Sequence, residues 1–105
     1  MPLYNLILLD LSLNLIVNIK FLKKIIKKLK KLKTLYLNDN KINDISPLIK
    51  TDDNNDIKLI LELEGLTLKN NCLDLKDQTT KNIIENFIKN SHSCFDYDEN
   101  DLYDF

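Results

Sequence analysis

The sequence predicts one small α/β domain in which three similar units each contribute a short strand to a parallel sheet. Three observations predict this fold class. The length of 105 residues suits a single domain, and a hydrophobic content of 44% excludes a disordered chain. A leucine-rich pattern also occurs three times along the chain. With one glycine and two prolines, a turn-rich all-β fold is disfavoured.

The repeated pattern is L-x-x-L-x-L-x-x-N-x-[IL]. It appears as LILLDLSLNLI from Leu6, LKTLYLNDNKI from Leu32 and LEGLTLKNNCL from Leu63. The central leucine pair of each unit flanks one other residue, which is the alternation of a short strand with one buried face. Each unit has one asparagine at the same place: Asn14, Asn40 and Asn71. We expect these to lie in a column, because a carboxamide can bond both kinds of backbone group that a sharp turn leaves unpaired.

This pattern resembles the leucine-rich repeat. In the first two units it continues with an apolar residue at every third position, Ile16, Ile19 and Leu22 and then Ile42, Ile45 and Leu48. That continuation resembles the type of repeat found in a regulatory subunit of protein phosphatase 1 and in internalins. The resemblance covers roughly residues 5–75. This sequence departs from the family in the third unit, where no such apolar run follows Leu73, and in the spacing of the asparagines, which is 26 and then 31 residues.

The resemblance implies a short solenoid with three parallel strands on a concave face and helices on the convex side. The implied domain spans residues 1–90, with repeats near 6–31, 32–62 and 63–90, and an acidic aromatic tail at 91–105.

The segments between the strands predict the remaining elements. Residues 21–33, FLKKIIKKLKKLK, have apolar positions at helical spacing and predict a helix behind the sheet. Residues 51–56 predict a polar loop, and residues 57–63 fit either a strand or a helical turn. Asp77 is expected to cap a C-terminal helix through residues 80–88 that covers the last unit. A helical bundle is the alternative fold, because leucine and lysine both favour helices.

Charge is divided unevenly along the chain. Residues 1–50 contain ten lysines and three acids, whereas residues 51–105 contain five lysines and thirteen acids. Two interpretations are open: the charge dipole steers a partner or favours head-to-tail self-association, or the charges form a solvated surface with no such role. The leucine-rich start is interrupted by Asp10 and Asn14, so it predicts neither a signal peptide nor a membrane span. We expect a cytoplasmic protein, with the nucleus as the alternative.

No catalytic or metal-binding pattern is present. The single histidine, His92, lies near the end of the chain, where nothing predicts the packing that a catalytic triad needs. The acidic segments 52–56 and 96–101 resemble the start of a calcium loop but lack its glycine. Cys72 is expected to be a small buried side chain and Cys94 an exposed thiol. We therefore expect no enzyme, no metal and no cofactor.

The resemblance implies a non-catalytic protein–protein interaction module that binds a protein partner through its concave face. The outward-facing strand residues expected to form that face are Leu8, Asp10, Ser12, Thr34, Tyr36, Asn38, Thr67 and Lys69. Tyr36 is the expected anchor, since aromatic residues dominate binding energy at interface centres. The alternative is binding of a membrane surface or an acidic partner through helix 21–33. Nucleic acid is disfavoured, because arginine and interleaved aromatic residues are missing from that segment.

Overall fold

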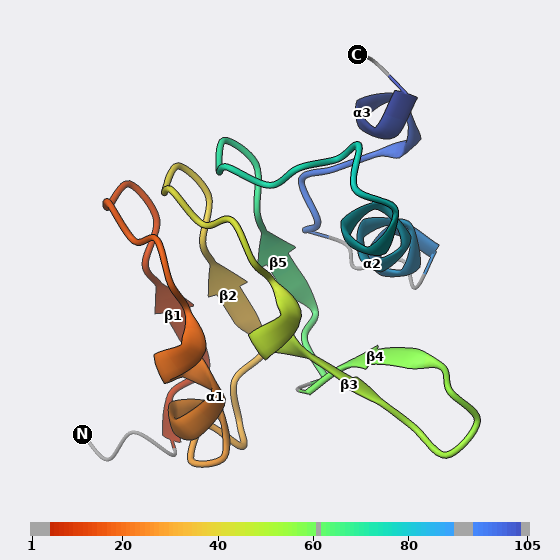
Figure 1. Ribbon diagram of the computed structural model, residues 1–105. Helices are drawn as coiled ribbons and strands as arrows, with labels where there is room; N and C mark the ends of the chain where they lie inside the picture. Colours follow the sequence, from red (N-terminus) through yellow and green to blue (C-terminus); the bar gives the residue numbers. More distant parts are fainter. Residues whose placement is uncertain (1–4, 61, 90–93, 104–105) are drawn as a thin grey trace.

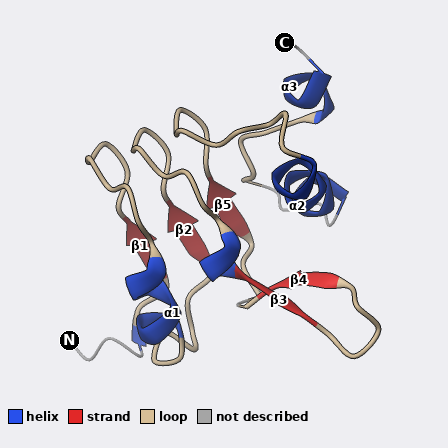
Figure 2. Ribbon diagram, viewed as in Figure 1, coloured by secondary structure: helices blue, strands red, loops and turns tan. Residues whose placement is uncertain are grey.

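The chain folds around a three-stranded parallel sheet, with α1 and η2 on one of its faces and α2 at its β5 end (Figures 1 and 2). The computed structural model describes residues 5–60, 62–89 and 94–103. In chain order the elements are β1 (Leu8–Asp10), α1 (Lys20–Ile26), β2 (Thr34–Tyr36), the 3-10 turn η2 (Ser46–Leu48), β3 (Ile49–Thr51), β4 (Ile57–Leu59), β5 (Gly65–Thr67), α2 (Gln78–Lys89) and α3 (Glu99–Tyr103). The prediction of a small α/β domain with a three-stranded parallel sheet is confirmed.

The register of the sheet follows the repeated sequence pattern. The strand order is β1-β2-β5, and Leu9 lies opposite Leu35, which lies opposite Leu66. Leu35 and Leu66 are fully buried. Alternate residues of a strand point to opposite faces, so the residues on either side of these leucines point to the other face of the sheet.

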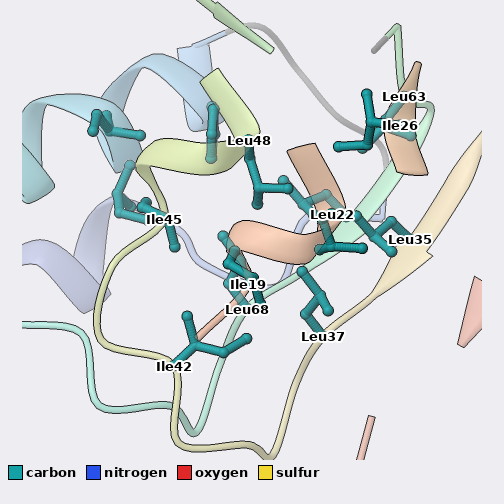
Figure 3. Packing of buried hydrophobic residues seen from close by; sticks show 14 of the residues in the cluster. Ile19, Leu22, Ile26, Leu35, Leu37, Ile42, Ile45, Leu48, Leu63 and Leu68 are labelled. Atoms are coloured by element: carbon teal, nitrogen blue, oxygen red, sulfur yellow. The ribbon is translucent and has the colours of Figure 1, made fainter. Parts of the chain in front are cut away.

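The hydrophobic core lies between the sheet and the elements behind it (Figure 3). Leu22 and Ile26 of α1, Leu35 of β2 and Leu48 of η2 are all buried in this one cluster. Full burial of a leucine or isoleucine side chain contributes about 1.5–3 kcal/mol. The sheet therefore owes its stability mainly to this aliphatic layer.

Helix α1 is shorter than the sequence predicted. It ends at Ile26 rather than near residue 33. Leu29 and Leu32 are nevertheless buried, and tight turns in which Leu29 N donates to Ile26 O and Leu32 N to Leu29 O bring them to the core. These turns carry the chain from the end of α1 to β2 with both leucines buried.

An antiparallel hairpin follows η2 and was not predicted. β3 pairs with β4, with Lys50 opposite Lys58, which resolves the ambiguous segment in favour of a strand over Ile57–Leu59. The polar loop is its turn, where Asp52 Oδ1 accepts hydrogen bonds of 2.9 Å from the backbone nitrogens of Asn54 and Asp56. The hairpin holds the additional residues of the second spacing outside the parallel sheet.

The C-terminal segment packs on the β5 end of the sheet. Thr80 N donates to Asp77 Oδ2 over 3.0 Å, which confirms Asp77 as the cap of α2. The Phe95 ring meets Phe87 of α2 edge-on, with ring centroids 5.7 Å apart. Leu102 of α3 is buried in the same core cluster. The described part of the tail is thus packed as part of this domain.

Candidate functional site

The face of the sheet opposite α1 brings the predicted binding residues together. The strand register aligns Leu8 with Thr34, and Asp10 with Tyr36 and Thr67. The next residues of the same alternation are Ser12, Asn38 and Lys69. We call this surface the outer sheet face. It contains all eight residues that the sequence singled out.

Tyr36 occupies the centre of the outer sheet face. It lies on the middle strand, between Asp10 on β1 and Thr67 on β5, and it is partly exposed. Within the described residues its hydroxyl has no hydrogen-bond partner. A large ring with a free hydroxyl in such a place suits binding, since tyrosine offers both apolar contact and one polar bond.

The β1 end of the outer sheet face carries a fixed negative charge. Asp10 Oδ1 accepts hydrogen bonds from Ser12 Oγ at 2.5 Å and Ser12 N at 3.0 Å. These two bonds, the side-chain bond first, lower the pKa of Asp10 from its ordinary value. The carboxylate therefore stays ionised at neutral pH and is held in one orientation.

The β5 end of the outer sheet face is occupied by internal contacts. Thr67 Oγ1 donates to Asn38 Oδ1 over 2.6 Å. Lys69 Nζ lies 3.2 Å from Asp101 Oδ2 and 6.0 Å from the centre of the Tyr97 ring. These three predicted binding residues are thus engaged within the domain, and the accessible part of the face is its β1 and β2 side.

The tail covers β5 through a close approach at Gly65. A β-carbon at this position would lie 3.0 Å from Cys94 Cβ and 3.2 Å from Thr34 Cγ2, so a larger residue here would crowd the tail and force a neighbour to shift. Asp96 accepts hydrogen bonds of 2.8 Å from Leu68 N and Lys69 N. This contact was not predicted from the sequence. Its one signal was the glycine at the position that Leu8 and Thr34 occupy in the other units.

Asn40 joins its own unit to the preceding one. Its Nδ2 donates to Leu11 O at 2.9 Å and to Leu37 O at 3.1 Å. Its Oδ1 accepts from Ile16 N at 3.1 Å. Asn40 is only 4% exposed, so these bonds replace those that water would otherwise supply to the turn.

Asn71 makes the equivalent bonds one unit later. Its Nδ2 donates to Leu37 O at 2.9 Å and to Leu68 O at 2.8 Å, and its Oδ1 accepts from Ile42 N at 2.9 Å. Asn14 is exposed and donates only to carbonyl groups of its own turn, those of Leu11 and Ser12. The bonds that join one unit to the one before therefore occur at the second and third asparagines.

Cys72 is exposed, so the prediction of a buried thiol was wrong. It stands in the third unit where Lys41 stands in the second, one place after the inward-facing asparagine, and this position points outward. Cys94 is exposed, as predicted. His92 lies outside the described residues. Among those that are described, no three histidine, cysteine or acidic side chains are grouped so that they could hold a metal ion.

The apolar side of α1 is not accessible. Leu22 and Ile26 are buried in the core, and the exposed residues of the helix are Lys20, Phe21, Lys23 and Lys24. A membrane or an acidic partner would therefore meet the lysines and Phe21 of this helix rather than its apolar side. No helix in the described part of the chain has the length and hydropathy needed to cross a bilayer.

Comparison with protein-family models, with curated proteins and with solved structures gave no match to this chain.

Proposed function

We propose that the chain is a short leucine-rich-repeat solenoid that binds a protein partner, without catalysis, through the outer sheet face. The single observation that carries the binding role is Tyr36, a partly exposed aromatic at the centre of the face. Aromatic residues in central positions contribute most of the energy in many interfaces.

Recurrent hydrogen bonds support the repeat architecture. Leu11 N donates to Tyr36 O at 2.9 Å, and one unit later Leu37 N donates to Thr67 O at 3.0 Å. The bonds of Asn40 to the unit before it recur in the same way at Asn71. A repeat of bonds as well as of residues is what stacked windings of a solenoid require.

The accessible side of the face defines the partner. Around Tyr36 it offers the apolar Leu8, the small Thr34 and the ionised Asp10, so it fits a partner with an apolar anchor beside a basic or donor group. Because the tail covers the β5 end, the surface is narrow. We expect a transient interaction at the low end of interface sizes.

The test is capture of partners from cell extract by the wild type and by Tyr36→Ala, with Lys50→Ala on the hairpin as a matched control. A partner that is retained by wild type and control but lost by Tyr36→Ala is then purified and its affinity measured. Loss of an anchor of this kind weakens binding by about 2 kcal/mol or more. Equal binding by wild type and Tyr36→Ala would exclude the outer sheet face as the site.

A further inference from the structure

The first unit exposes apolar side chains that the other units do not. Every large hydrophobic residue that is markedly exposed in the described structure lies between positions 7 and 21. They are Ile7, Leu8, Leu13, Leu15, Val17 and Phe21. Leu13 and Leu15 are 78% and 79% exposed. We call Leu13, Leu15, Val17 and Phe21 the apolar ridge.

The fold does not require apolar residues at the first three ridge positions, Leu13, Leu15 and Val17. By the register of the sheet, positions 13, 15 and 17 correspond to Asp39, Lys41 and Asn43 in the second unit and to Asn70, Cys72 and Asp74 in the third. Those six positions include no large hydrophobic residue. The same backbone is therefore built with polar side chains elsewhere in this chain, and the leucines of the first unit need another explanation.

Leu13 is also in a strained conformation. Its φ is 58°, in the left-handed region, and its counterparts Asp39 and Asn70 both have φ of 60°. Asparagine and aspartate tolerate that region, whereas leucine does not. A strained and exposed leucine is explained neither by local preference nor by the core, and such residues point to a role in function.

Lysines lie at the α1 end of the apolar ridge, while Asp10 and Asp39 lie near its Leu13 end. Residues 11–38 contain eight lysines and no acidic residue. Lys20, Lys23 and Lys24 are exposed on α1 beside Phe21. The C-terminal half of the chain carries the excess of acids, so an anionic surface would attract the first unit and repel the rest. This charge distribution sets one orientation for docking.

We propose that the apolar ridge and the lysines of α1 dock the domain on an anionic lipid surface. The ridge belongs to the loop after β1 and the segment running down to α1, at the outer edge of the domain (Figure 1). A protruding ridge fits a fluid membrane interface, which needs no matching groove. Leucine, valine and phenylalanine bury into the boundary of headgroups and acyl chains, while lysines remain at the anionic headgroups.

Two other occupants fit less well. A second copy meeting this edge with its own first unit would bring two lysine clusters together. A second copy meeting it with its β5 end would offer acids but no matching apolar patch, since the markedly exposed large hydrophobic residues of the described chain all lie in the first unit. The lipid surface alone accounts for both the charge and the ridge.

The test is co-sedimentation with vesicles of phosphatidylcholine alone and of phosphatidylcholine mixed with phosphatidylserine. We expect binding only to the mixed vesicles, weakening as salt is added because the Debye length falls. The variant Leu13→Asn, Leu15→Ser, Val17→Asn should bind about a hundredfold less tightly. Lys23→Gln with Lys24→Gln should bind about tenfold less tightly. Lys50→Gln with Lys76→Gln, which removes the same charge elsewhere, should bind like wild type.

Several outcomes would overturn the proposal. Failure of the wild type to sediment with phosphatidylserine vesicles at low salt is one, and unchanged binding by the triple variant with native circular dichroism is another. If wild type and the triple variant bind poly-glutamate equally tightly, the lysines form a general polyanion site instead. Light scattering that shows a dimer in the wild type and a monomer in the triple variant would assign the ridge to self-association. Tyr36→Ala should leave vesicle binding unchanged, which separates this test from that of the proposed function.

Discussion

The Asp96 carboxylate accepts a 2.8 Å hydrogen bond from the backbone nitrogen of Leu68. In the earlier units the equivalent nitrogens, those of Leu11 and Leu37, donate to carbonyl groups of the next strand. Asp96 therefore supplies the acceptor that a further strand would provide. One side chain of the tail thus pairs two backbone donors, Leu68 N and Lys69 N, directly after β5.

Replacing Asp96 should destabilise the domain. Asp96→Ala removes the acceptor of two backbone donors, Leu68 N and Lys69 N, and we expect a loss of about 1–3 kcal/mol in the free energy of unfolding. Urea denaturation measures this loss, and amide hydrogen exchange should quicken first at residues 68 and 69. The exposed loop residue Asp53 offers the control: Asp53→Ala should leave both measurements unchanged. Equal behaviour of the two variants would contradict the role of Asp96.

The three asparagines should differ in their contribution to stability. Asn40→Ala removes bonds to the preceding unit from a buried site and leaves Leu11 O and Ile16 N without that partner, so we expect a loss of about 2–3 kcal/mol. Asn14 is exposed and bonds only within its own turn, and Asn14→Ala should cost about 0.5–1 kcal/mol. Chemical denaturation of the two variants tests the difference. Equal losses would show that the bonds between units contribute no more than those within a turn.

Gly65 should not tolerate a side chain. In Gly65→Ala the new methyl group meets Cys94 Cβ at 3.0 Å, and such crowding costs roughly 1–3 kcal/mol. The double variant Gly65→Ala, Cys94→Gly removes Cys94 Cβ, the atom that the new methyl group would contact, and should recover part of the lost stability. A double-mutant cycle by denaturation measures the coupling. Strict additivity would show that the two residues do not meet in solution.

Leu13→Asn should stabilise the domain even as it removes an apolar side chain. Leucine in the left-handed region costs about 1–2 kcal/mol. The third unit has an asparagine, Asn70, at the equivalent position, with φ of 60°. We expect the midpoint of urea denaturation to be higher for the variant than for the wild type. A fall in stability would mean that Leu13 makes packing contacts that outweigh its backbone strain.

Alkaline pH should loosen the tail through Tyr97. Burial, followed by the charges of Asp96 and Asp101, raises the pKa of Tyr97 from 10.0 to about 12. The folded state favours the neutral phenol. The contribution of Tyr97 to the free energy of unfolding is therefore complete below pH 10 and is lost as the pH rises toward about 12. The tyrosinate absorbance of wild type minus that of Tyr97→Phe isolates this titration. A midpoint near 10 would contradict the burial of Tyr97.

Local patterns predicted the sheet and its turns. The positions of Leu9, Leu35 and Leu66 in their motifs set the register, because alternation and burial leave one arrangement for each strand. The cap at Asp77 followed from side-chain chemistry within one turn. These features depend on residues close together in the chain, which a single sequence displays directly.

Features that depend on distant residues were not predictable. The end of α1 at Ile26 is decided by where Leu29 and Leu32 must be buried, and a helical spacing alone does not reveal this. The strands β3 and β4 are as short as those of the parallel sheet, but no repeated motif marks them in the sequence, so their pairing was not predictable. The contact of the tail with Gly65 joins residues 29 apart in sequence and had no signal beyond the glycine itself.

The hairpin of β3 and β4 shows how the domain accommodates extra length. Its turn at Asp52–Asp56 projects away from the parallel strands (Figure 1), and the alignment of β2 with β5 is kept despite the longer connection. Insertions at this turn should therefore leave the outer sheet face intact. A fluorophore or epitope placed there would label the protein without altering the proposed binding surface.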